Sequence, residues 1–165
     1  MNSRVLAALA ASVLGLAGCS SSSSANQKVP ATFATQVAQV CASNLARYPT
    51  IGSFPYSNFN PHDPSASQLP AVGAYFAGNQ RSIQPFESAL TALGEPSTDA
   101  NSWNNVKTLV VSFYGNAIAQ KNAALASNVS AFVSLVKQNQ TLTNQLKAAA
   151  TRAGISVTGP CANEF

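Results

Sequence analysis

Charged residues are scarce in this chain. Asp, Glu, Lys and Arg make up 8% of the 165 residues, against roughly 25% in an average soluble protein. The net charge of +4 comes from 9 basic and 5 acidic residues spread thinly along the sequence. A nucleic-acid-binding protein needs clustered Lys and Arg to displace counterions, and no such cluster is present. We therefore predict no nucleic-acid partner, although the 46% share of hydrophobic residues is sufficient for a folded core.

Residues suited to catalysis are also few. The only histidine, His62, is followed directly by Asp63, and adjacent side chains rarely point at each other productively. The chain has no Gly-x-Ser-x-Gly motif. The acidic residues are scattered, with no pair spaced as in a glycosidase, and are better explained by helix capping and solvation: Asp63, Glu87, Glu95, Asp99 and Glu164. We predict a protein that is not an enzyme and holds no metal or cofactor.

An apolar segment stands at the start of the sequence. After Arg4, the uncharged run from Val5 to Gly18 is shorter than the about 20 residues that a membrane-spanning helix needs. A basic start, an apolar centre and small residues at the end are typical of a secretory signal peptide. Residues 1–18 are therefore predicted to direct export.

The residues Leu16-Ala17-Gly18-Cys19 resemble the bacterial lipobox, in which the terminal cysteine receives a diacylglyceryl group before cleavage. This resemblance implies that Cys19 becomes the lipidated first residue of the mature chain, anchored to the outer face of the cell membrane. A simple secreted protein with a stray cysteine is the alternative. Residues 19–30, with five consecutive serines, form a predicted flexible tether, and residues 31–165 form the folded domain.

Assigning Cys19 to lipid leaves an even pair of cysteines, Cys41 and Cys161. In an oxidising compartment such a pair predicts a disulfide. Two free thiols are the alternative. Two cysteines and one histidine cannot complete a structural zinc site.

Apolar residues recur at helical spacing in four stretches of the domain. The first helix is expected over 32–48, with Cys41 facing the core. The second is expected over 67–93, capped by Ser67, with a kink or break between Gly78 and Pro85. The third starts after Ser97 or Asp99, and Asn128 caps the fourth, which ends at Gly154. The expected core stripes comprise Phe33, Val37, Val40, Cys41 and Tyr48; Leu69, Val72, Phe76, Ile83, Phe86, Leu90 and Leu93; Trp103, Val106, Val110, Phe113, Ala117 and Ala124; and Phe132, Leu135, Leu142, Leu146, Ala149 and Ala153.

Short connections between the second, third and fourth stretches predict an all-α, up-down bundle of about four helices, with a C-terminal tail pinned by the disulfide. At this level the chain resembles the small, uncharacterised lipoproteins of actinobacteria, particularly mycobacterial examples. The shared features are a lipobox, a Ser-rich tether, a helical domain and a cysteine in the first helix with a partner near the C-terminus. The resemblance implies a location and a fold but no activity.

The segment 48–61 combines aromatic residues with prolines in one long loop, which is unusual in a small bundle. Its aromatic side chains are suited to binding a partner or ligand, or alternatively to covering the open end of the bundle; they are Tyr48, Phe54, Tyr56 and Phe59. We favour the cover.

Asparagines on three different helices fall at one level if the turns near residues 97 and 127 reverse the chain. Asn79 then lies level with Asn116, and that level meets Asn139. Buried amides can fix the register of a bundle or line a small cavity, provided that they are hydrogen-bonded. The alternative is that helix rotation turns them toward solvent.

These features favour a non-enzymatic, lipid-anchored protein of the cell envelope that binds a partner or a small apolar ligand. Two alternatives remain at this point. One is an envelope hydrolase with a serine-based site that no motif reveals, and the other is a purely structural surface lipoprotein.

Overall fold

The computed structural model describes residues 28–47, 53–162 and 164–165, without the side chains of residues 81–83. Its helices are α1 (Ala31–Leu45), α2 (Leu69–Ala92), α3 (Ala100–Leu125) and α4 (Val129–Ala153), followed by a short 3₁₀ helix, η2 (Gly159–Cys161). These described ranges contain no strand. The predicted all-α class and the four helices are confirmed.

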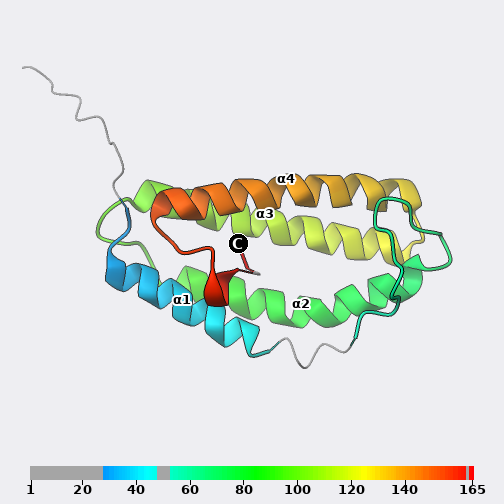
Figure 1. Cartoon of the computed structure of the whole chain (residues 1–165), viewed down its shortest axis with the longest axis horizontal. Helices are drawn as coiled ribbons and strands as arrows, with labels where there is room; N and C mark the ends of the chain where they lie inside the picture. Colours follow the sequence, from blue (N-terminus) through cyan, green and yellow to red (C-terminus); the bar gives the residue numbers. More distant parts are fainter. Residues whose placement is uncertain (1–27, 48–52, 163) are drawn as a thin grey trace, which may run out of the picture.

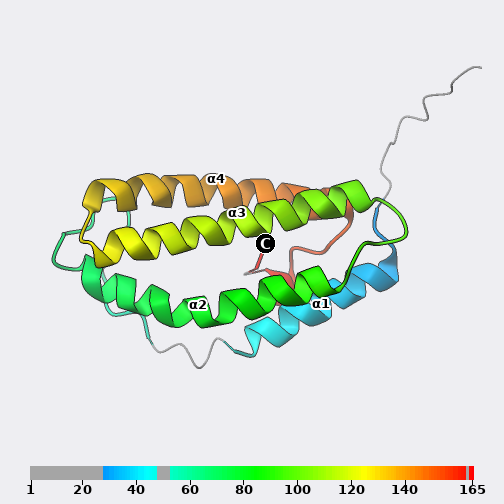
Figure 2. The same ribbon diagram turned by 180° about the vertical axis from the view of Figure 1, so that it is seen from behind.

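Successive helices run in opposite directions, which gives the expected up-down arrangement (Figure 1). The central helix is α3, because it packs along both α2 and α4, whereas α2 and α4 have little backbone contact with each other in the described part of the chain. With 15 residues, α1 is much shorter than α2, α3 and α4. It therefore covers only one half of the bundle, and the loop before α2 folds over the other end (Figures 1 and 2).

Short-range sequence signals place most of the helix ends. Asp99 caps α3, because its carboxylate accepts a hydrogen bond from the backbone N–H of Ser102 at 3.4 Å. Asn128 caps α4 in the same way, accepting from the N–H of Ala131 at 3.1 Å. Gly154 ends α4 in the left-handed conformation, with a φ of 79° that glycine adopts without strain.

The structure corrects the expected boundaries of α1 and α2. Of the kink or break expected between Gly78 and Pro85, the break is wrong, since α2 continues through both residues as a single helix. Its N-cap is Gln68 rather than Ser67 and makes no capping bond through its side chain. The helix α1 ends at Leu45, three residues before the predicted end at Tyr48, which lies outside the described residues.

The apolar core has two parts. The larger cluster fills the half of the bundle that α1 covers and contains Trp103 and Phe33, whose rings meet edge to face with centroids 5.0 Å apart. The smaller cluster lies near the other end and consists of Leu69, Val72, Ala124 and Phe132. Between the two clusters, α3 buries other residues than those expected from helical spacing. Phe113 and Ala117 are half-buried, whereas Tyr114, Asn116 and Gln120 are buried.

Elsewhere the expected core residues are buried or partly buried, with Val40, Phe76, Leu93, Leu135 and Leu142 in the second group. The side chain of Ile83 lies outside the described part. The core positions predicted from helical spacing are thus largely those that the fold buries.

The tail after α4 returns across the bundle to α1. Cys161 forms the predicted disulfide with Cys41, and the two Cα atoms are 5.1 Å apart. Both cysteines are completely or almost completely buried, as are Ile155 and Phe165 of the tail. The predicted disulfide-pinned tail is confirmed, and it forms part of the larger core cluster.

Candidate functional site

Aromatic side chains gather where the loop before α2 folds over the end of the bundle. Phe59 contacts the buried Phe132 of α4, with ring centroids 6.1 Å apart, and Tyr56 stacks beside Phe59 at 6.4 Å. Phe54 lies against Phe59 at 5.4 Å and edge-on to Tyr75 of α2 at 5.0 Å. We call the five residues Phe54, Tyr56, Phe59, Tyr75 and Phe76 the aromatic cap.

The aromatic cap has an inner and an outer part. Tyr56, Phe59 and Phe76 are partly buried and pack directly against the smaller core cluster. Phe54 is 37% exposed and does not belong to that packing layer. The loop therefore covers the end of the bundle that α1 does not reach, as favoured from the sequence. Phe54 on its outer side presents an aromatic face to solvent.

The three asparagines predicted to share a level fall between the two apolar clusters, but the level is wrong for Asn79. Because Gln80 accepts from Lys121, Asn79 lies more than one helical turn from Asn116 along α3. Asn116 is 5% exposed, and its side-chain NH₂ donates to Oε1 of Gln138 on α4 at 2.9 Å. Asn79 and Asn139 are half-buried, but the Oδ1 atom of each is buried and has no hydrogen-bond partner in the described structure.

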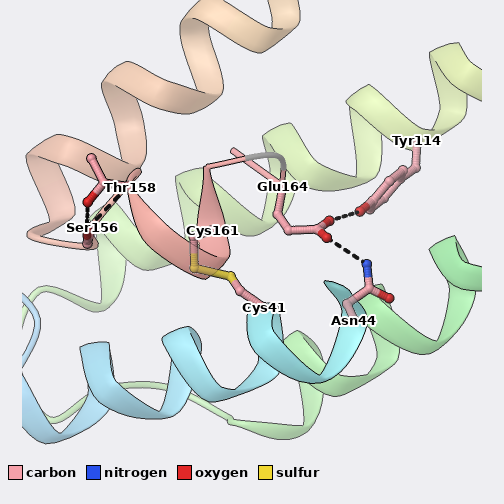
Figure 3. The surroundings of a disulfide bond; sticks show 7 residues. All are labelled: Cys41, Asn44, Tyr114, Ser156, Thr158, Cys161 and Glu164. Carbon is pink, nitrogen blue, oxygen red and sulfur yellow. Dashed lines mark hydrogen bonds between the residues drawn. A yellow bond between two sulfur atoms is a disulfide. The ribbon is translucent and has the colours of Figure 1, made fainter. Parts of the chain in front are cut away.

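A buried polar cluster that the sequence did not reveal surrounds the disulfide (Figure 3). Asn44 of α1 donates to the carboxylate of Glu164 at 2.9 Å, and the hydroxyl of Tyr114 on α3 donates to the same carboxylate at 3.4 Å. Glu164 is 4% exposed. The signal that could have found it is the matched spacing: Asn44 and Glu164 each follow a disulfide cysteine by three residues, which is about one helical turn.

The two acidic residues in the turn before α3 have structural roles. Asp99 caps α3, and Glu95 accepts a hydrogen bond from the side chain of Asn104 at 3.1 Å. His62 is exposed, and its backbone N–H donates to Oδ1 of Asn60 within a turn. Asp63 is exposed beside it. The structure therefore brings no described acidic residue against His62 from another element of the fold.

The described residues contain no group of three or more His, Cys, Asp and Glu side chains that could hold a metal ion. None of the helices in the described ranges is long and apolar enough to span a membrane. Cys19, the predicted lipidation site, lies outside the described residues, as does Tyr48 of the predicted aromatic segment.

Comparison with known proteins gives no match to the chain, whether with family models, curated proteins or solved structures.

Proposed function

We propose that this chain is a non-enzymatic, lipid-anchored protein of the cell envelope that binds a partner protein through the outer face of the aromatic cap. The observation that carries the proposal is that only part of the aromatic cap packs against the core. Tyr56 and Phe59 pack directly against the smaller core cluster, whereas Phe54 lies outside that layer, against Phe59, and remains 37% exposed. An aromatic side chain exposed beyond what the core requires is suited to recognition.

The position of the cap in the fold supports this role. The start of the described chain is held at the opposite end of the bundle, where the N–H of Val29 donates to the carbonyl of Ala153 at 3.0 Å. The 26 residues of α3 separate the two ends, and at 1.5 Å per residue they span about 39 Å. A lipid on Cys19, joined through the Ser-rich tether, would therefore attach the domain at the end that is remote from the cap (Figure 1).

The composition agrees with recognition by contact rather than by charge. With 8% charged residues, the chain has little capacity to steer a partner electrostatically. Phe54 and the adjacent exposed Pro55 offer a stiff apolar surface, and ordering a proline-containing segment on binding costs less entropy than ordering a Gly/Ser loop.

The anchor is tested by the substitution Cys19→Ala. The protein is expected to move from the membrane fraction to the aqueous fraction, because it loses its acyl chains and the described helices offer no spanning segment. Detergent phase partitioning of whole cells measures this shift. Unchanged partitioning would contradict the lipoprotein assignment.

The binding face is tested in the anchored protein with a photo-crosslinking side chain at position 54. A matched control carries the same group at Thr35, which is exposed on α1 in the other half of the bundle. A discrete adduct at position 54 and none at position 35 is expected. Equal labelling at the two positions would show that the cap has no partner of its own.

A further inference from the structure

The aromatic cap lies in an uncharged part of the chain. No Asp, Glu, Lys or Arg lies within three residues of any of its members in the sequence, and on α2 the uncharged stretch runs from Leu69 to Gln80. The ammonium group of Lys121 is bound to Gln80, more than one helical turn beyond Tyr75. A charged group of a partner that docks here would lose its hydration without gaining an opposite charge, so the cap selects an uncharged surface.

Two hydroxyl groups of the cap have no protein partner. Tyr56 and Tyr75 are partly buried through their rings, and neither hydroxyl makes a hydrogen bond among the described residues. Neither hydroxyl is a buried atom without a partner, so both are accessible to solvent. Because a phenolic hydroxyl is a hydrogen-bond donor, the cap offers two donors to a ligand.

The rings beside these hydroxyls form one continuous aromatic surface between the loop and α2, which meet at the same end of the bundle (Figure 1). Phe54 lies edge-on to Tyr75, with centroids 5.0 Å apart and ring planes at 81°. Phe59 contacts both Phe54 and Tyr56 and thereby joins the second hydroxyl-bearing ring to the first. The cap thus combines an apolar ring surface with two hydroxyl donors and no charge.

These features restrict the chemistry of the partner, which has to offer an apolar surface and uncharged acceptors together. An α-helix uses its carbonyl groups internally. A polyproline II segment has no internal hydrogen bonds, so its carbonyl oxygens are free to accept. Each proline adds an apolar ring and brings no backbone N–H that would need an acceptor in the cap. Surfaces lined by aromatic rings recognise such segments in several unrelated protein modules.

We propose that the outer face of the aromatic cap binds an uncharged, proline-rich segment of the partner in the polyproline II conformation. Proline rings pack on Phe54, and backbone carbonyl oxygens of the segment accept hydrogen bonds from the hydroxyls of Tyr56 and Tyr75. Such a segment is extended before it binds, so ordering it costs little entropy. This inference rests on the proposed partner binding and specifies the chemistry that the cap recognises.

The test measures binding of a dye-labelled oligoproline of about ten residues to the anchored protein in detergent micelles, by fluorescence anisotropy. A peptide of alternating Gly and Ser of the same length is the control probe. Saturable binding of the oligoproline is expected, with binding of the Gly/Ser peptide at least about tenfold weaker. Raising the salt concentration from about 50 mM to about 1 M should not weaken the binding, because no charge pair contributes to it.

Substitutions then locate the contact. Tyr75→Phe removes only a hydroxyl and should weaken oligoproline binding about fivefold, the equivalent of one neutral hydrogen bond. The control Thr35→Val removes a hydroxyl from an exposed position on α1 and should leave the affinity unchanged.

The inference is overturned if the oligoproline does not bind, if the Gly/Ser peptide binds equally well, or if salt weakens the binding. Crosslinking from position 54 in the anchored protein separates this failure from that of the proposed function. A discrete adduct there together with any of these three results retains the partner and rejects the proline-rich segment, whereas the absence of an adduct rejects partner binding itself and this inference with it.

Discussion

Removing the disulfide is expected to destabilise the domain strongly. The bond closes a sequence separation of 120 residues, and for a loop of that size the chain-entropy model assigns about 5 kcal/mol. The tail retains other attachments when the bond is absent, including the hydrogen bond from Asn44 to Glu164 and the contact between Phe86 and Phe165. Because these contacts persist in the folded state, the loss should derive mainly from the freed unfolded chain, and we expect about 3 to 5 kcal/mol.

The assay is equilibrium unfolding in urea of the wild type and of the double variant Cys41→Ala/Cys161→Ala. The double substitution leaves no unpaired thiol, so the comparison reports the bond rather than side reactions. At roughly 3 °C per kcal/mol for a domain of this size, the melting temperature should fall by about 10 °C. Reductant should lower the stability of the wild type and leave the double variant unchanged. A loss below about 1 kcal/mol, or two thiols that alkylate in the native protein, would refute the reasoning.

Two further predictions concern positions where the backbone decides the outcome. Gly73→Ala should destabilise α2, because the added Cβ would lie 2.8 Å from the backbone nitrogen of Leu125 on α3. At Gly78 an added Cβ meets nothing within 4 Å, so Gly78→Ala should stabilise the helix by about 0.5 to 1 kcal/mol, as measured by thermal unfolding. Equal effects at the two glycines would contradict the close approach of α2 and α3. Asp99→Ala should cost about 1 to 2 kcal/mol, because it removes the cap of α3 at a residue with a φ of 56°, and Asp99→Asn should retain most of the stability. An unchanged melting temperature in Asp99→Ala would show that the cap contributes nothing.

Local signals predicted the features of the fold that local interactions determine. Asp99, Asn128 and Gly154 mark helix ends because each acts on backbone groups within a few residues. The prediction of a break in α2 between Gly78 and Pro85 was wrong because packing distant from these residues outweighs their local propensity. Local propensity disfavours a helix there, but the buried Val72 on one side and Phe86 on the other hold α2 in one piece.

The predicted common level of Asn79, Asn116 and Asn139 holds only in part. Asn116 binds Gln138, the neighbour of Asn139, as the short turn between α3 and α4 predicts. The hydrogen bond between Lys121 and Gln80 places Asn79 more than one helical turn from Asn116 along α3. The burial of Glu164 was missed even though the disulfide that brings the tail to α1 was predicted, because its pairing with Asn44 follows only from combining that disulfide with the equal spacing of the two residues after their cysteines. The exposure of Phe54 beside the covered Phe59 likewise depends on how the loop meets α2 and α4.

The most direct test of the proposed partner binding compares Phe54→Ala with Phe59→Ala in the anchored protein, measuring melting temperature and partner crosslinking together, with the crosslinking group at the exposed Pro55. Phe59 contacts the buried Phe132, so its loss should destabilise the domain by about 2 to 3 kcal/mol. Phe54→Ala should change stability by less than about 1 kcal/mol and yet greatly reduce the crosslinked adduct. If Phe54→Ala leaves the adduct intact, or reduces it only in proportion to lost stability, the aromatic cap is a cover for the core and the proposed binding function is contradicted.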